Sequence, residues 1–147
     1  MICTKKRLWI CTGLIAAILI FIWGNSLMPA QVSHALSEWV KGLLKPFLPE
    51  NAPLTQEENG FLRKLAHFAE FAALGFCLAW RRGMLRKPQR TGFFLGAAAA
   101  ATDEFIQCFV PNRGPGVADV LLDSCGVLTG MLFLYLGHTL LNKRIKH

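Results

Sequence analysis

Carboxylates, basic side chains and one histidine recur at helical spacing between residues 63 and 123. Arg63, His67 and Glu70 stand at positions i, i+4 and i+7, which places them on one face of a helix. Carboxylates beside a histidine can transfer protons or hold a divalent cation, and lysine and arginine bind phosphate or carboxylate groups. The candidate ligand-binding residues are Lys64, His67, Glu70, Asp103, Glu104, Gln107, Arg113, Asp119 and Asp123.

Two overlapping subsets of these residues carry the possible chemistry. The candidates for acid–base catalysis are His67, Glu70, Asp103, Glu104 and Asp123. The candidate metal ligands are Glu70, Asp103, Asp119 and Asp123. When Arg63 is counted with this set, three basic and five acidic residues give a charge of −2 with a neutral histidine. Either burial keeps some carboxylates protonated, or a cation such as a divalent metal ion or an ammonium group completes the site.

Motifs of several common sites are missing from the sequence. We find no Cys/His spacing typical of zinc, no serine nucleophile elbow, no Walker loop and no dinucleotide fingerprint. The sequence therefore assigns no reaction to these residues.

The chain that carries these groups is unusually apolar. Hydrophobic residues make up 53% of its 147 residues, and charged residues make up 17% against about 25% in soluble domains. A domain of this size buries only about two-thirds of its surface, so in water it would expose too much apolar surface. Disorder is excluded by the same composition. We therefore expect an all-α integral membrane protein with a single domain, residues 1–147.

We expect four transmembrane helices, at approximately residues 8–28, 61–80, 91–110 and 118–141. The first run could instead be a cleaved signal peptide, but it is long for one and lacks a good cleavage site. The second run has charged residues in its first half, so the alternative is a helix that lies in the membrane interface. A crossing second helix is favoured because it agrees with the charge pattern of the loops.

Basic residues are segregated from acidic residues along the chain. Eleven of the 16 lysines and arginines lie in residues 5–7, 81–90 and 143–146, which contain no acidic residue. This is the positive-inside pattern, and it predicts both termini and the middle loop in the cytoplasm of a multi-pass inner-membrane protein. The positive net charge therefore gives no support to nucleic-acid binding.

The first outer loop, residues 29–60, has a helical pattern of its own. Apolar residues recur at helical spacing from Val32 to Phe47, which predicts a short amphipathic helix. This helix would lie at the membrane interface or pack on the outer ends of the other helices. The capping box from Thr55 to Glu58 predicts that a new helix begins near Gln56.

With this topology, the polar groups of three helices lie at a similar depth. His67, Asp103 and Asp123 are each roughly 10 Å inside the outer end of their helix at 1.5 Å per residue. We expect Glu70, Asp103 and Asp123 to lie close together around a polar pocket that opens outward. Arg113, in the turn before the last helix, would fold over the opening.

The charged faces of these helices coincide with faces suited to packing. Asp119 and Asp123 lie on one helical stripe that continues through Gly126 and Gly130. Small residues at this spacing allow close approach of a second helix, and Gly92-x-x-x-Gly96 with five alanines offers another such surface.

Four segments, taken in order, resemble the VanZ-like family of bacterial membrane proteins, which is named for teicoplanin resistance. They are KLAHFAEF (64–71), DEFIQCF (103–109), PNR (111–113) and DVLLDSCG (119–126). The polar pair Asn25-Ser26 after the first span is also similar to the family pattern, whereas Asp123 departs from it, since the family usually has Asn there. The resemblance implies a four-helix inner-membrane protein that acts at the outer face.

Two classes of function follow from these observations. In the first, the site binds or processes a cell-envelope molecule, such as a lipid head group or a lipid-linked cell-wall precursor, and it affects glycopeptide susceptibility. Lys64, His67 and Arg113 would then contact phosphate or carboxylate groups. In the second, the protein is non-catalytic and structural or partner-binding. Its intramembrane charges would only hold the helices together, for example through a Lys64–Asp103 or an Arg113–Asp119 pair.

Overall fold

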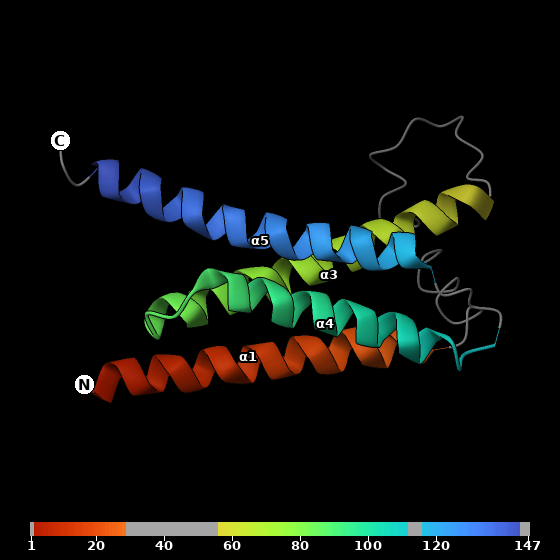
Figure 1. The fold of residues 1–147 in the computed structure, drawn as a ribbon, viewed down its shortest axis with the longest axis horizontal. Helices are drawn as coiled ribbons and strands as arrows, with labels where there is room; N and C mark the ends of the chain where they lie inside the picture. Colours follow the sequence, from red (N-terminus) through yellow and green to blue (C-terminus); the bar gives the residue numbers. More distant parts are fainter. Residues whose placement is uncertain (1, 29–55, 112–115, 145–147) are drawn as a thin grey trace, which may run out of the picture.

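The computed structural model describes residues 2–28, 56–111 and 116–144, and all their regular secondary structure is helical (Figure 1). The four helices are α1 (Ile2–Ser26), α3 (Gln56–Met84), α4 (Gln89–Gln107) and α5 (Val117–Arg144). The expected all-α architecture is confirmed for these residues. The amphipathic helix expected within residues 32–47, and Arg113, lie outside them.

Successive helices run in opposite directions along the bundle (Figure 1). Helices α1 and α4 run toward one end, and α3 and α5 run back. The start of α1, the end of α5 and the turn between α3 and α4 therefore lie at the same end of the bundle. We call this the basic end, because Lys5–Arg7 and Arg86, Lys87 and Arg90 are exposed there. The other end is called the polar end.

Two of the described helices are long and apolar enough to cross a membrane, Lys5–Ser26 within α1 and Val117–Leu141 within α5. Their large apolar side chains are mostly exposed, with Ile20 at 72% and Phe133 at 70% of full exposure. The core helix of a soluble protein buries such side chains, so their exposure supports contact with lipid. The described residues of α3 and α4 do not form a segment that is both long and apolar enough to pass the same test. The four-span arrangement therefore stays a prediction.

The helices differ from the predicted spans at their ends. Helix α3 begins at Gln56, as the capping box predicts, and continues past residue 80 to Met84. Helix α1 begins at Ile2 rather than near residue 8, because lysine and arginine form helices well and charge alone does not end one. Helix α4 ends at Gln107 instead of residue 110, and the next residues form turns closed by backbone hydrogen bonds such as Cys108 N to Glu104 O at 3.2 Å.

Helices α3 and α5 approach each other through glycine. A Cβ added to Gly130 would overlap the carbonyl oxygen of Ala72, and one added to Gly126 would lie 2.6 Å from the carbonyl oxygen of Phe68. The stripe of small residues on α5 thus packs against α3, as its spacing predicts. Helices α3 and α4 each contact all three other helices, and the contact between α3 and α5 is the most extensive in the bundle.

A small apolar core lies directly beside the polar residues. Ile22, Phe71, Leu74, Ala100 and Val127, one or more from each helix, pack together and are almost fully buried. Phe71 and Leu74 follow His67 by one and two turns of α3, so the core fixes the rotation of α3 at the level of the polar residues.

Candidate functional site

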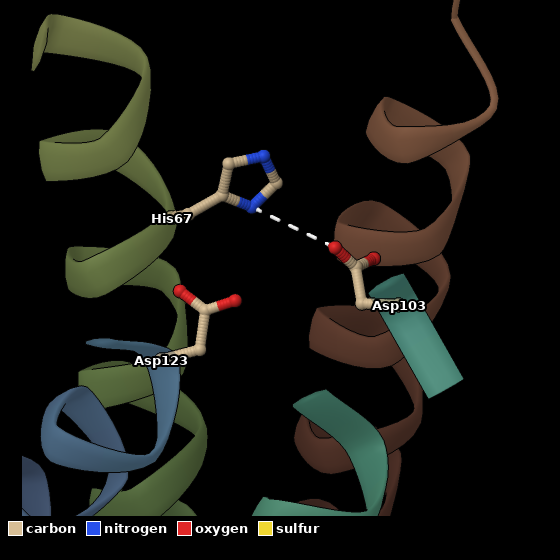
Figure 2. A group of neighbouring side chains, drawn as sticks. All are labelled: His67, Asp103 and Asp123. Atoms are coloured by element: carbon tan, nitrogen blue, oxygen red, sulfur yellow. Dashed lines mark ion pairs between the residues drawn. The ribbon is translucent and has the colours of Figure 1, made fainter. Parts of the chain in front are cut away.

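Three buried polar side chains from three helices meet near the polar end (Figure 2). They are His67 of α3, Asp103 of α4 and Asp123 of α5, with exposed fractions of 8%, 0% and 2%. One nitrogen or oxygen of each residue lies within 4.8 Å of those of the other two. We call His67, Asp103 and Asp123 the central cluster. The predicted meeting of Asp103 and Asp123 is present in the fold, but His67 takes the place expected for Glu70, which lies beside His67.

The first helix also contributes to this region through Ser26. The Ser26 hydroxyl donates a hydrogen bond to Asp103 Oδ2 at 2.8 Å, and Gln107 Nε2 donates to the same oxygen at 2.9 Å. Ser26 is fully buried, and Gln107 Nε2 also lies 3.4 Å from its hydroxyl oxygen. The sequence prediction did not include Ser26 among the site residues. The signal in the sequence that could have indicated Ser26 was the neutral polar pair Asn25-Ser26, which ends a long apolar run.

Glu70 lies beside the central cluster and is linked to the same helix. Asn25 Nδ2 donates to Glu70 Oε1 at 3.4 Å. His67 Nδ1 lies 3.6 Å from Glu70 Oε2 and 4.0 Å from Asp103 Oδ2, so the ring faces two carboxylates at once. Within the described residues, the buried oxygens Glu70 Oε2 and Asp103 Oδ1 have no hydrogen-bond donor.

The remaining charged residues have partners closer to the surface. Lys64 of α3 forms an ion pair with Asp119 of α5, and the two side chains are 47% and 23% exposed. The Lys64–Asp103 pair offered above as an example is therefore not formed. Glu104 Oε2 accepts a hydrogen bond from the backbone N–H of Gly116 at 2.9 Å, which ties the end of α4 to the start of α5.

A cavity of about 10 Å³ separates the central cluster from these outer residues. It has room for roughly one water molecule or one ion. Its lining residues are Arg63, Lys64, His67, Glu104, Gln107, Asp119, Leu122 and Asp123. Eight of the nine candidate ligand-binding residues therefore lie in or beside one region, and the ninth, Arg113, lies outside the described residues.

A larger groove of about 680 Å³ lies elsewhere, toward the basic end. It is formed by the last turns of α3 and the second half of α5, with Trp80, Met131 and Tyr135 among its lining residues. The groove is apolar and contains none of the candidate residues, so an acyl chain suits it better than a charged group.

Comparison with known proteins gives one match. Residues 11–140 match the family described as VanZ/LLP1, a range that includes the central cluster and parts of all four described helices. No curated protein and no solved structure matches the chain.

Proposed function

This chain belongs to the VanZ/LLP1 family of membrane proteins, and from that premise we propose that its polar end binds the head group of an envelope molecule. The molecule is a membrane lipid or a lipid-linked cell-wall precursor with a phosphate or carboxylate group. In this proposal all four helices cross the inner membrane, both termini lie in the cytoplasm and the polar end faces outward.

The arrangement of charge along the bundle supports this orientation. Exposed basic residues occur at the basic end, in the first turns of α1 and in the turn between α3 and α4, and these two segments lie at the same end of the bundle (Figure 1). Cytoplasmic loops carry such an excess of lysine and arginine. The central cluster lies toward the opposite end of the same helices, so it would lie in the outer half of the bilayer.

The observation that carries the proposal is the meeting of buried polar side chains from three helices beside Arg63 and Lys64, which we call the basic rim and which share the cavity with Glu104 and Asp119. Ionisable groups within a membrane domain are costly and are retained where they serve a function. Arg63 and Lys64 line the outer side of the cavity, where they would contact an anionic group. The cavity holds roughly one water molecule, so a head group would contact this rim and would not enter the central cluster.

A second function is favoured by the contacts between helices. The Lys64–Asp119 pair joins α3 to α5, and the Ser26–Asp103 hydrogen bond joins α1 to α4. These contacts would hold the bundle together in a non-catalytic protein that supports the envelope or a partner. In that case, removing a charge would lower the stability of the bundle and leave lipid binding unchanged.

Native mass spectrometry of the purified protein tests the proposal. We expect the protein from nanodiscs of phosphatidylglycerol and phosphatidylcholine to retain the anionic lipid preferentially. The double variant Arg63→Gln/Lys64→Gln should lose this preference, because it removes the basic rim. Lys87→Gln/Arg90→Gln is the matched control, since it removes the same charge at the basic end.

Two results would contradict the head-group proposal. One is equal retention of both lipids by the wild-type protein. The other is an unchanged preference in the rim variant together with a lowered melting temperature, which is the result expected of purely structural charges.

A further inference from the structure

The central cluster has the composition and spacing of a metal site. One imidazole nitrogen and two carboxylate oxygens lie within 4.8 Å of one another. In a tetrahedral site with bonds of about 2.0–2.1 Å, the ligand atoms are about 3.3–3.4 Å apart. Small rotations of His67, Asp103 and Asp123 about their side-chain bonds would close the difference. Figure 2 shows the Asp123 carboxylate directed toward His67, and the His67 ring directed toward Asp103.

The carboxylates of the cluster are only partly satisfied, because Ser26 and Gln107 donate to one oxygen of Asp103 and not to the other. Asp103 is fully buried, and its Oδ1 has no hydrogen-bond donor among the described residues. Asp123 is 98% buried, and no hydrogen bond or ion pair to it is seen in the described part of the chain. Lys64 cannot compensate this charge, because it is paired with Asp119 nearer the surface. Burial of an unpaired carboxylate is costly, and a bound cation removes that cost.

Hydrogen bonds already orient the cluster as they do around metal ions. Ser26 and Gln107 both donate to Asp103 Oδ2, which leaves Oδ1 available. Asn25 donates to one oxygen of Glu70 and leaves the other within 3.6 Å of His67 Nδ1. Carboxylates that bind metals are usually held by such outer hydrogen bonds.

We propose that His67, Asp103 and Asp123 bind one divalent transition-metal ion, of the kind represented by Zn²⁺ or Mn²⁺. An imidazole ligand favours first-row transition-metal ions over Mg²⁺ and Ca²⁺. Zn²⁺ and Mn²⁺ both accept carboxylate ligands as well. The neighbouring cavity of about 10 Å³ provides a fourth position for a water molecule. Short sequence motifs do not reveal this site because its three ligands come from three helices.

The metal site goes beyond head-group binding and does not depend on it. A metal ion would bring the net charge of the central cluster to zero when both carboxylates are ionised, since it supplies two positive charges. It would also join α3, α4 and α5 through one centre. The metal and the lipid are therefore measured separately, and either can fail without the other.

Metal binding is measured on the full chain in detergent, after removal of metal with a chelator and exchange into chelator-free buffer. We expect equilibrium titration and elemental analysis to give one Zn²⁺ or Mn²⁺ per chain. Asp123→Asn keeps the side-chain volume and should weaken binding at least 10-fold. Glu57→Gln is the control, because it removes the same charge near the start of α3, ten residues or about 15 Å of helical rise before His67. Its affinity should change less than threefold.

Co²⁺ provides a second measurement that needs no variant. A tetrahedral site with nitrogen and oxygen ligands gives cobalt an intense visible absorption, which excess Zn²⁺ should abolish. Failure of the wild-type chain to bind any of these ions at one per chain would overturn the proposal. Equal weakening by Glu57→Gln and Asp123→Asn would overturn it as well, since the ion would then be held by general negative charge and not by the central cluster.

Discussion

Ser26 of α1 donates a 2.8 Å hydrogen bond to Asp103 of α4, and neither side chain is exposed. Helix α1, which has no acidic or basic residue near the site, is thus joined to Asp103, the most buried carboxylate of the site. Because Asp103 Oδ2 also accepts from Gln107, the hydroxyl is one of two donors that hold the carboxylate in place.

Ser26→Ala should lower the free energy of unfolding by about 1–3 kcal/mol, because a buried carboxylate loses a donor that water cannot replace. Thermal unfolding in detergent is the measurement. Thr102→Val serves as the control, since the Thr102 hydroxyl bonds only within its own helix, to Ala98 O, and is exposed. Equal shifts for the two variants would show that the Ser26–Asp103 bond contributes nothing specific.

Gly130→Ala should disrupt the bundle, because the new methyl group would overlap the carbonyl oxygen of Ala72. We expect a lower melting temperature and a loss of monodisperse protein in size-exclusion chromatography. Gly137→Ala is the matched control one heptad further along α5, where no heavy atom lies within 4 Å of the added carbon. It should be neutral or stabilise the helix by up to about 1 kcal/mol. Similar behaviour of both variants would contradict the close packing of α3 on α5.

Reporter fusions test the proposed orientation. Fusions after Arg86 and after His147 should both give a cytoplasmic signal, because the basic segments lie beside these positions. An extracytoplasmic signal after Arg86 would refute the four-span arrangement.

His67→Ala should abolish the effect of the protein on glycopeptide susceptibility or on the envelope, when this effect is divided by the amount of membrane-inserted protein. His67 faces the carboxylates of Glu70 and Asp103, so its loss removes the group that connects them. His138→Ala is the control, because His138 lies about 22 Å further along α5 than Asp123 by helical rise. Full activity per folded molecule in His67→Ala would defeat the functional role of this residue.

The Lys64–Asp119 pair should contribute little to stability, since Lys64 is half exposed and such pairs are worth about 0.2–1 kcal/mol. A double-mutant cycle with Lys64→Ala and Asp119→Ala measures the coupling from thermal or denaturant unfolding. A coupling free energy well above this range would favour a purely structural role for the outer charges.

The positions of the helices were predictable from apolar runs in the sequence. Of their ends, the capping box predicted the start of α3, but hydropathy did not predict the others. Gln56 begins α3 as the capping box predicts, because that signal depends on local hydrogen bonding alone. Hydropathy measures the apolar part of a helix, so it missed the basic turns that extend α1 back to Ile2 and α3 on to Met84.

The carboxylates of the site were predictable because helical rise and phase are fixed by geometry. Asp103 and Asp123 were placed at one depth on inward faces, and the structure brings them together with His67. Ser26 was missed because a neutral side chain gives no charge signal, and its role depends on how α1 packs against α4. Asp119 shares a face with Asp123 but lies one turn nearer the surface, where Lys64 reaches it.

The central place of α3 has a consequence for how the protein is made. This helix contacts all three of the others, yet its described residues are less apolar than the candidate membrane spans in α1 and α5. Both α3 and α4 contain ionisable residues, which oppose insertion, so these helices are poor candidates for independent entry into the bilayer. The translocon would release them efficiently only once α5 is available to cover their polar faces. A chain truncated before α5 should therefore be degraded during biogenesis.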